Sequence, residues 1–179
     1  TGVSAFVQVR GDTSGVPEVA APAVEATAPV VAEPVVAEAS SGGTLVFQTV
    51  SGGPIYAIQA DGRNLRYLTT GLDPAISPDG QWVAFARWDH PGFGALGSVW
   101  VMNLDGSGEA QQLTNLPGDE YHPAWSPDGD EIVFRTTNPD TGQRQLYIMN
   151  SSGQAQRQLI TSQANDDSPA WDPDSSWIV

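Results

Sequence analysis

A motif built around a proline–aspartate corner occurs three times in this chain of 179 residues. The central copy reads Pro-Ala-Trp-Ser-Pro-Asp-Gly-Asp-Glu-Ile-Val-Phe over residues 123–134, and the other copies begin at Pro74 and Pro169. The corner prolines lie 49 and then 46 residues apart, at Pro78, Pro127 and Pro173. Because this spacing is nearly constant, the sequence predicts a repeat protein with one structural unit per interval.

The corner itself has the chemistry of a tight turn between two strands. Proline presets φ near −65°, the aspartate side chain bonds back to the turn, and glycine supplies the positive φ that closes it. Apolar runs on both sides of the corner are typical of antiparallel strands. In the third copy Ser175 replaces the glycine, and a left-handed conformation costs serine about 1 kcal/mol. We therefore expect this hairpin to be the weakest of the three.

Each unit contains four short apolar runs and no helix signal. Counted from the run that ends in phenylalanine, the second and third runs are joined by two-residue hairpin turns, Asp61-Gly62, Asp105-Gly106 or Ser152-Gly153. Four short strands per unit of about 46 residues indicate a propeller blade. The first unit lacks a Pro-Ala-Trp run before Leu45-Val46-Phe47, and residues 176–179 begin a fourth unit. We predict an all-β fold, a partial β-propeller of about three four-stranded blades within a longer protein, with the six tryptophans packed between blades.

The composition changes along the chain and predicts three segments. Residues 1–15 form an N-terminal arm, residues 16–41 a linker rich in proline, alanine, valine and glutamate, and residues 42–179 the blades. Four prolines within the linker prevent a helix of useful length, and its glutamates repel one another. An extended Pro/Ala-rich linker is therefore expected to precede the propeller.

The charge of the chain excludes several classes of function. Its net charge is −14, and all seven basic residues are arginine. A chain this acidic lacks the positive surface that binds nucleic acid or anionic lipid, so we predict no nucleic-acid partner. Without cysteine it forms no disulfide. No apolar run reaches the roughly 20 residues of a membrane span, so membrane attachment is expected only through a segment not present in the sequence.

The repeat also resembles a known family. Trp-Ser-Pro-Asp-Gly with Ile-Val-Phe, then Leu-Tyr-Ile-Met-Asn, a glycine turn and Gln-Leu-Thr, is similar to the repeats of TolB-like β-propellers, related in pattern to WD-repeat blades. The resemblance covers about residues 43–179. Similar blades occur in the periplasmic TolB protein of the Tol-Pal system and in prolyl-oligopeptidase-like and tricorn-like proteases. It implies a non-catalytic, exported module, periplasmic or extracellular, that binds or scaffolds proteins as an accessory subunit tethered to a membrane complex.

Two alternatives remain open on the same resemblance. The chain would also fit the gating propeller of a prolyl-oligopeptidase-like hydrolase whose catalytic domain is absent from this sequence. A carbohydrate-binding propeller is the third interpretation, because tryptophans on loops stack on sugars. The hydrolase interpretation requires a downstream domain with a Gly-x-Ser-x-Gly motif. The carbohydrate-binding interpretation requires a loop tryptophan such as Trp88.

A partner-binding surface is expected on one face of the blades. A WD-type strand order places the Pro-Ala-Trp strand innermost and gathers the long connections 88–97 and 137–144 on the same face as the polar loops between units. Variable loops on a rigid scaffold usually carry recognition. The predicted partner-binding residues are Trp88, His90, Phe93, Asp119, Glu120, His122, Asp166 and Asp167.

The sequence carries no motif of a known catalytic centre. It contains no nucleophile elbow, no zinc-binding His-Glu pattern and no phosphate-cradling glycine loop. We therefore predict that the chain is not an enzyme and has no catalytic residue and no cofactor. The acidic loops at 119–120 and 166–167 have the oxygen ligands that calcium prefers, but no twelve-residue calcium loop accompanies them, so no metal site is predicted.

Overall fold

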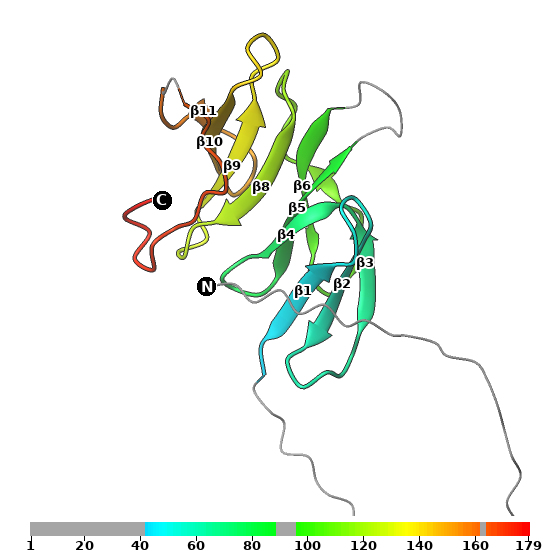
Figure 1. Ribbon diagram of the computed structural model, residues 1–179. Helices are drawn as coiled ribbons and strands as arrows, with labels where there is room; N and C mark the ends of the chain where they lie inside the picture. Colours follow the sequence, from blue (N-terminus) through cyan, green and yellow to red (C-terminus); the bar gives the residue numbers. More distant parts are fainter. Residues whose placement is uncertain (1–41, 89–95, 162–163) are drawn as a thin grey trace, which may run out of the picture. The chain divides into compact units, whose positions relative to one another are not determined.

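Eleven strands in three antiparallel sheets make up the computed structural model, which describes residues 42–88, 96–161 and 164–179 (Figure 1). The first sheet has the order β1-β2-β3, the second β4-β5-β6-β7 and the third β8-β9-β10-β11. The predicted arm and linker lie outside the described residues. Within the described ranges, no helix has the length and apolarity needed to cross a membrane.

The strands follow the chain order of the predicted units. Their bounds are β1 Thr44–Gln48, β2 Pro54–Gln59, β3 Arg66–Thr70, β4 Leu72–Ile76, β5 Trp82–Trp88, β6 Gly97–Asn103, β7 Gln111–Gln112, β8 Glu120–Trp125, β9 Glu131–Thr137, β10 Arg144–Asn150 and β11 Arg157–Gln158. Two sheets have four strands, and the first has three, because no strand equivalent to β4 and β8 pairs with β1 among the described residues. The prediction of an all-β partial propeller is confirmed.

The last strands of the second and third sheets are shorter than the Gln-Leu-Thr runs suggest. In the second sheet, β7 ends at Gln112, although Leu113 N–H still donates to the Val99 carbonyl at 2.8 Å. The Val99 N–H donates instead to the hydroxyl of Thr114, also at 2.8 Å. A side-chain acceptor therefore takes the place of a backbone carbonyl, and regular pairing ends there.

The apolar core lies between neighbouring sheets. Ile55, Ala57 and Leu68 of the first sheet cluster with Val83 and Phe85 of the second. A second cluster joins Val99 of the second sheet to residues of the third, Ile132, Phe134 and Met149. Each sheet after the first thus buries its phenylalanine against the sheet before it. The equivalent Phe47 in β1 is 39% exposed, since no described residues cover that side.

The tryptophans only partly follow the expectation that they pack between blades. Trp100 and Trp125 pack against the two core clusters, and the Trp171 indole N–H donates to the Ala124 carbonyl at 3.1 Å. Trp88, however, is 38% exposed and Trp177 is 73% exposed. Trp88 lies at the end of β5 and Trp177 beside the third corner, beyond the reach of these clusters.

The three proline–aspartate corners close as predicted. In the first two, the serine before the proline donates its hydroxyl to the aspartate, Ser77 to Asp79 and Ser126 to Asp128. In the third, Asp172 accepts from the Ser176 and Trp177 N–H groups, both at 2.7 Å. Ser175 has a φ of +57°, which confirms the left-handed conformation expected where the other copies have glycine.

The packing between the second and third sheets can be tested at Gly153. Its φ of +82° matches the +84° of Gly62 in the equivalent turn of the first sheet. A Cβ at Gly153 would lie 2.8 Å from the Leu113 carbonyl oxygen, whereas a Cβ at Gly62 would meet nothing within 4 Å. Gly62→Ala should therefore lower the free energy of unfolding by about 1 kcal/mol through backbone strain alone.

Gly153→Ala carries the same strain and adds a backbone clash, so it should cost at least about 1 kcal/mol more than Gly62→Ala. Urea unfolding of both variants measures the difference. Equal losses would mean that the contact between the Ser152-Gly153 turn and Leu113 does not constrain the second and third sheets.

Candidate functional site

An unusual backbone step recurs where successive units begin. Asp73, His122 and Ser168 each precede a proline and have φ values of +52°, +53° and +52°. A residue before proline normally adopts an extended conformation, and positive φ is uncommon outside glycine. In β4 and β8 the strand pairing shifts register at this step. Such strain costs of order 1–3 kcal/mol per residue and persists only where the surroundings enforce it.

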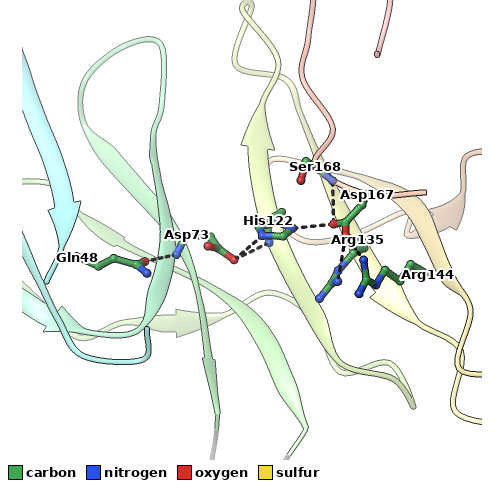
Figure 2. A network of polar contacts seen from close by, with 7 residues as sticks. All are labelled: Gln48, Asp73, His122, Arg135, Arg144, Asp167 and Ser168. Atoms are coloured by element: carbon green, nitrogen blue, oxygen red, sulfur yellow. Dashed lines mark hydrogen bonds and ion pairs between the residues drawn. The ribbon is translucent and has the colours of Figure 1, made fainter. Parts of the chain in front are cut away.

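Side chains hold these strained residues in place, and for Asp73 and His122 the side chain belongs to the preceding unit. The Asp73 N–H donates to the side-chain oxygen of Gln48 at 2.6 Å, and the His122 N–H donates to the Asp73 carboxylate at 3.3 Å. At the next unit, the Ser168 N–H donates to Asp167 at 2.9 Å. Figure 2 shows the resulting line of polar contacts from β1 to the segment after β11.

His122 lies at the centre of this line, between two carboxylates. Its Nε2 is 3.3 Å from Asp73 Oδ2, and its Nδ1 is 3.1 Å from Asp167 Oδ1 (Figure 2). A neutral imidazole carries one N–H, so only the protonated ring donates to both carboxylates at once. The ring therefore joins three consecutive units through one side chain that remains 36% exposed.

Asp167 is the most heavily paired carboxylate of the site. Arg144 Nη1 donates to its Oδ2, and Arg135 Nη1 lies 3.6 Å from the same oxygen. Partial burial by itself raises the pKa of Asp167, but Arg135, the Ser168 N–H, His122 and Arg144 together outweigh it and hold the pKa below its ordinary value. Asp167 is therefore an anion that neutralises part of a locally basic cluster.

Trp88 and Tyr121 form an aromatic pair beside the cluster. The Trp88 indole N–H donates to the Tyr121 hydroxyl at 3.1 Å, and the ring centroids are 6.1 Å apart. The Arg135 guanidinium lies over the Tyr121 ring at 4.8 Å from its centroid. Glycines make room for both rings, because a Cβ at Gly52 would lie 2.4 Å from Trp88 and one at Gly97 would lie 2.8 Å from Tyr121.

The structure corrects the expectation that Glu120 contacts a partner. Its side chain is fully buried, accepts a hydrogen bond from the Thr114 hydroxyl at 2.7 Å and accepts another from the Leu116 N–H at 2.8 Å. Burial raises the pKa of Glu120 to about 7, against the opposing effect of these hydrogen bonds. Glu120 thus holds the loop before β8 from the inside.

The other predicted residues divide into three groups. Asp119 accepts the Gly97 N–H at 2.9 Å and so fixes the start of β6, and the Asp166 N–H donates to the Arg144 carbonyl at 3.1 Å. Trp88, His122 and Asp167 lie on one surface, where contacts through Tyr121 and Arg135 connect them. His90 and Phe93 lie outside the described residues.

Sequence reasoning missed Asp73, Tyr121, Arg135 and Arg144, which complete the site. The repeated step of a polar residue before proline, at Asp73, His122 and Ser168, is the signal that identifies the first of them. The arginines lie within strands and carry no such signal. Among the described residues, no group of three or more histidine, cysteine, aspartate or glutamate side chains is arranged to hold a metal ion.

Comparisons with known proteins place these features in a family context. Residues 44–179 match the family model described as the TolB beta propeller domain. A protein TolB homolog of Chlorobium chlorochromatii is 36% identical over 124 residues, which are 67% of this chain and 26% of the relative. An uncharacterized peptidase of Bacillus subtilis, YuxL, is 25% identical over 168 residues, covering 75% of this chain and 24% of the relative.

A solved structure shows the same arrangement of strands. The putative TolB from Agrobacterium tumefaciens superposes with a TM-score of 0.60 and 25% sequence identity, over 73% of this chain and 46% of that one. The chain therefore spans about a quarter of the length of the curated relatives it matches, and less than half of this solved structure.

The buried carboxyl of Glu120 makes stability depend on pH. Because its pKa rises from 4.5 to about 7 on folding, the native protein keeps a proton that the unfolded chain loses. Stability is therefore greatest below pH 4.5 for this group and decreases as pH rises toward about 7, by up to about 1.4 kcal/mol per pH unit.

Glu120→Gln should remove this component of the slope, and urea unfolding at several pH values between 5 and 8 measures it. Glu109→Gln, at an exposed position, is the matched control and should leave the slope unchanged. If Glu120→Gln keeps the slope of the unchanged protein, the proton is held elsewhere.

Proposed function

Because the chain belongs to the TolB β-propeller family, we propose that it is a non-catalytic binding module whose strand-end surface docks a protein partner. This surface, called the rim surface below, consists of Trp88, Asp119, Tyr121, His122 and Asp167. The observation that carries the proposal is the exposed side chain of Trp88. It lies at strand ends where polar contacts join three consecutive units.

The rim surface has the chemistry of a protein-binding centre. Tryptophan, tyrosine and arginine dominate the residues that contribute most to protein–protein affinity. Trp88 is 38% exposed, and the side chain of Arg144 beside Asp167 is 48% exposed. Charged groups of both signs belong to the same network, with Arg135 against Tyr121 and paired with Asp167, and would fix the orientation of a partner.

Preorganisation supports the same proposal. A partner that binds a rigid surface loses less free energy to ordering loops and side chains. Here the strained residues Asp73 and His122 are each held by a hydrogen bond from their backbone N–H to a side chain of the preceding unit. Their strain is consistent with a surface shaped for contact rather than for stability alone.

The proposal also states that the protein is exported and is periplasmic or extracellular. In it, residues 16–41 act as an extended spacer that carries the blades at a distance from a membrane complex. Attachment to the membrane itself would use a segment outside this sequence. The support is the family assignment together with the proline-rich composition of residues 16–41.

One observation favours a second candidate function. The peptidase YuxL matches 75% of this chain, which would fit the propeller domain of a hydrolase. A fluorophosphonate probe applied to the full-length protein distinguishes the two. Covalent labelling of a serine in a Gly-x-Ser-x-Gly motif would establish the hydrolase, whereas absence of labelling favours the docking module.

The docking proposal can be tested with a photo-crosslinking amino acid at position 88 in the native host. We expect one dominant partner adduct from this position and none from position 63, which lies in the Asp61-Gly62 turn between β2 and β3. Adducts from position 63 alone would place docking at the other ends of the strands.

With the partner purified, isothermal titration calorimetry measures the contribution of the exposed ring. Trp88→Ala should weaken binding by about tenfold or more, the loss expected for a central aromatic contact. Arg63→Ala, whose side chain is 68% exposed, is the control and should change the affinity by less than about twofold. If Trp88→Ala and the unchanged protein bind the partner with equal affinity, the rim surface is not part of the interface.

A further inference from the structure

A cavity of about 430 Å³ lies between the second and third sheets, at the strand ends opposite the rim surface. The strand β5 runs from Trp82 at the cavity to Trp88 at the rim surface, and β8 runs from Glu120 to Trp125 at the cavity. The residues that define its chemistry are Asp79, Trp82, Val101, Leu113, Trp125 and Asp128. Its size is within the range of small-molecule sites.

Both walls of the cavity belong to complete four-stranded sheets. Trp82 and Val101 come from the second sheet, and Trp125 comes from the third. The cavity is therefore unrelated to the uncovered side of the first sheet, where Phe47 is exposed. All the residues that line the cavity belong to the described part of the chain.

Each of the two tryptophans is replaced in one other copy of the corner motif. In the second unit, the position equivalent to Trp125 is Ile76, and in the third unit the position equivalent to Trp82 is Glu131. The third copy keeps both tryptophans, as Trp171 and Trp177. Among the described gaps between sheets, this one alone has an indole on each wall, Trp82 on one side and Trp125 on the other.

Two ionised carboxylates stand at the same cavity. Asp79 and Asp128 close their corners with a single oxygen, Oδ1, which accepts from the serine hydroxyl and from one backbone N–H. Hydrogen bonds from Ser77 and Ser126 are the main cause that lowers the pKa of each aspartate. The described residues that line the cavity include no arginine, lysine or histidine to balance these charges.

We propose that this cavity binds an organic cation, with its ammonium or guanidinium group against Trp82 and Trp125 and its charge facing Asp79 and Asp128. Indole faces attract cations, and the attraction grows where water is partly excluded. The apolar floor of Val101 and Leu113 suits the hydrocarbon part of such a ligand. A neutral sugar would stack on the same rings but would gain no charge complementarity from the two carboxylates.

Calorimetric titration of the intact protein with choline and with 3,3-dimethyl-1-butanol tests the proposal, because the two probes have nearly the same shape and differ in charge. We expect saturable binding of choline at one site and at least about tenfold weaker binding of the neutral alcohol. Binding of choline should also weaken as salt is added.

Variants locate the site. Trp82→Leu and the double variant Asp79→Asn, Asp128→Asn should each weaken choline binding by about fivefold or more, while asparagine preserves the turn hydrogen bonds. Trp177→Leu and Asp174→Asn, at the equivalent positions of the third corner, are the matched controls and should bind as the unchanged protein does. Circular dichroism verifies that each variant folds. If Trp82→Leu does not fold, the aspartate double variant alone tests the proposal.

Three results would overturn the proposal. They are the absence of saturable binding of both choline and agmatine, equal affinity for the neutral alcohol, and choline binding that survives the aspartate variant. Saturable binding of methyl glucoside in place of choline would assign the cavity to carbohydrate instead. Because the cavity and the rim surface share no residue, none of these outcomes bears on the docking of a protein partner.

Discussion

Burial of one sheet's phenylalanine against the preceding sheet is the interaction on which this structure depends. Phe85 and Phe134 are fully enclosed in this way, and each lies in a cluster that joins two sheets. A single four-stranded sheet with apolar residues on both faces has no stable state of its own in water. Stability therefore arises from contacts between units, and the positions of the loops depend on the stacking of the sheets.

The polar contacts of the rim surface depend on that stacking. Asp73 holds the His122 backbone only because the second and third sheets lie at a fixed separation. His122 also reaches Asp167, in the segment that follows β11. Inside the third sheet, Glu120 ties the preceding loop to its strand through Thr114 and Leu116. Apolar packing between sheets thus sets the positions of polar groups at the surface.

The two ends of the strands differ in chemistry. At one end, variable loops and strained residues before proline present an aromatic pair and charges of both signs. At the other end, the proline–aspartate corners repeat with little change. The cavity between Trp82 and Trp125 lies there, next to two of these corners. The stack of sheets keeps the two ends apart, and the rim surface and the cavity share no residue.

The sequence by itself determined the strands, the corners and the blade architecture, because turn chemistry and alternation of apolar residues act over a few neighbouring residues. The WD-type strand order expected from the repeat also led to the prediction that Trp88, His122 and Asp167 share one face. Only the tertiary structure decided that Glu120 points inward, that His122 bridges Asp73 and Asp167, and that Arg135 stacks on Tyr121. These contacts join residues of different units, and their geometry follows from the distance and register between sheets, which no local pattern encodes.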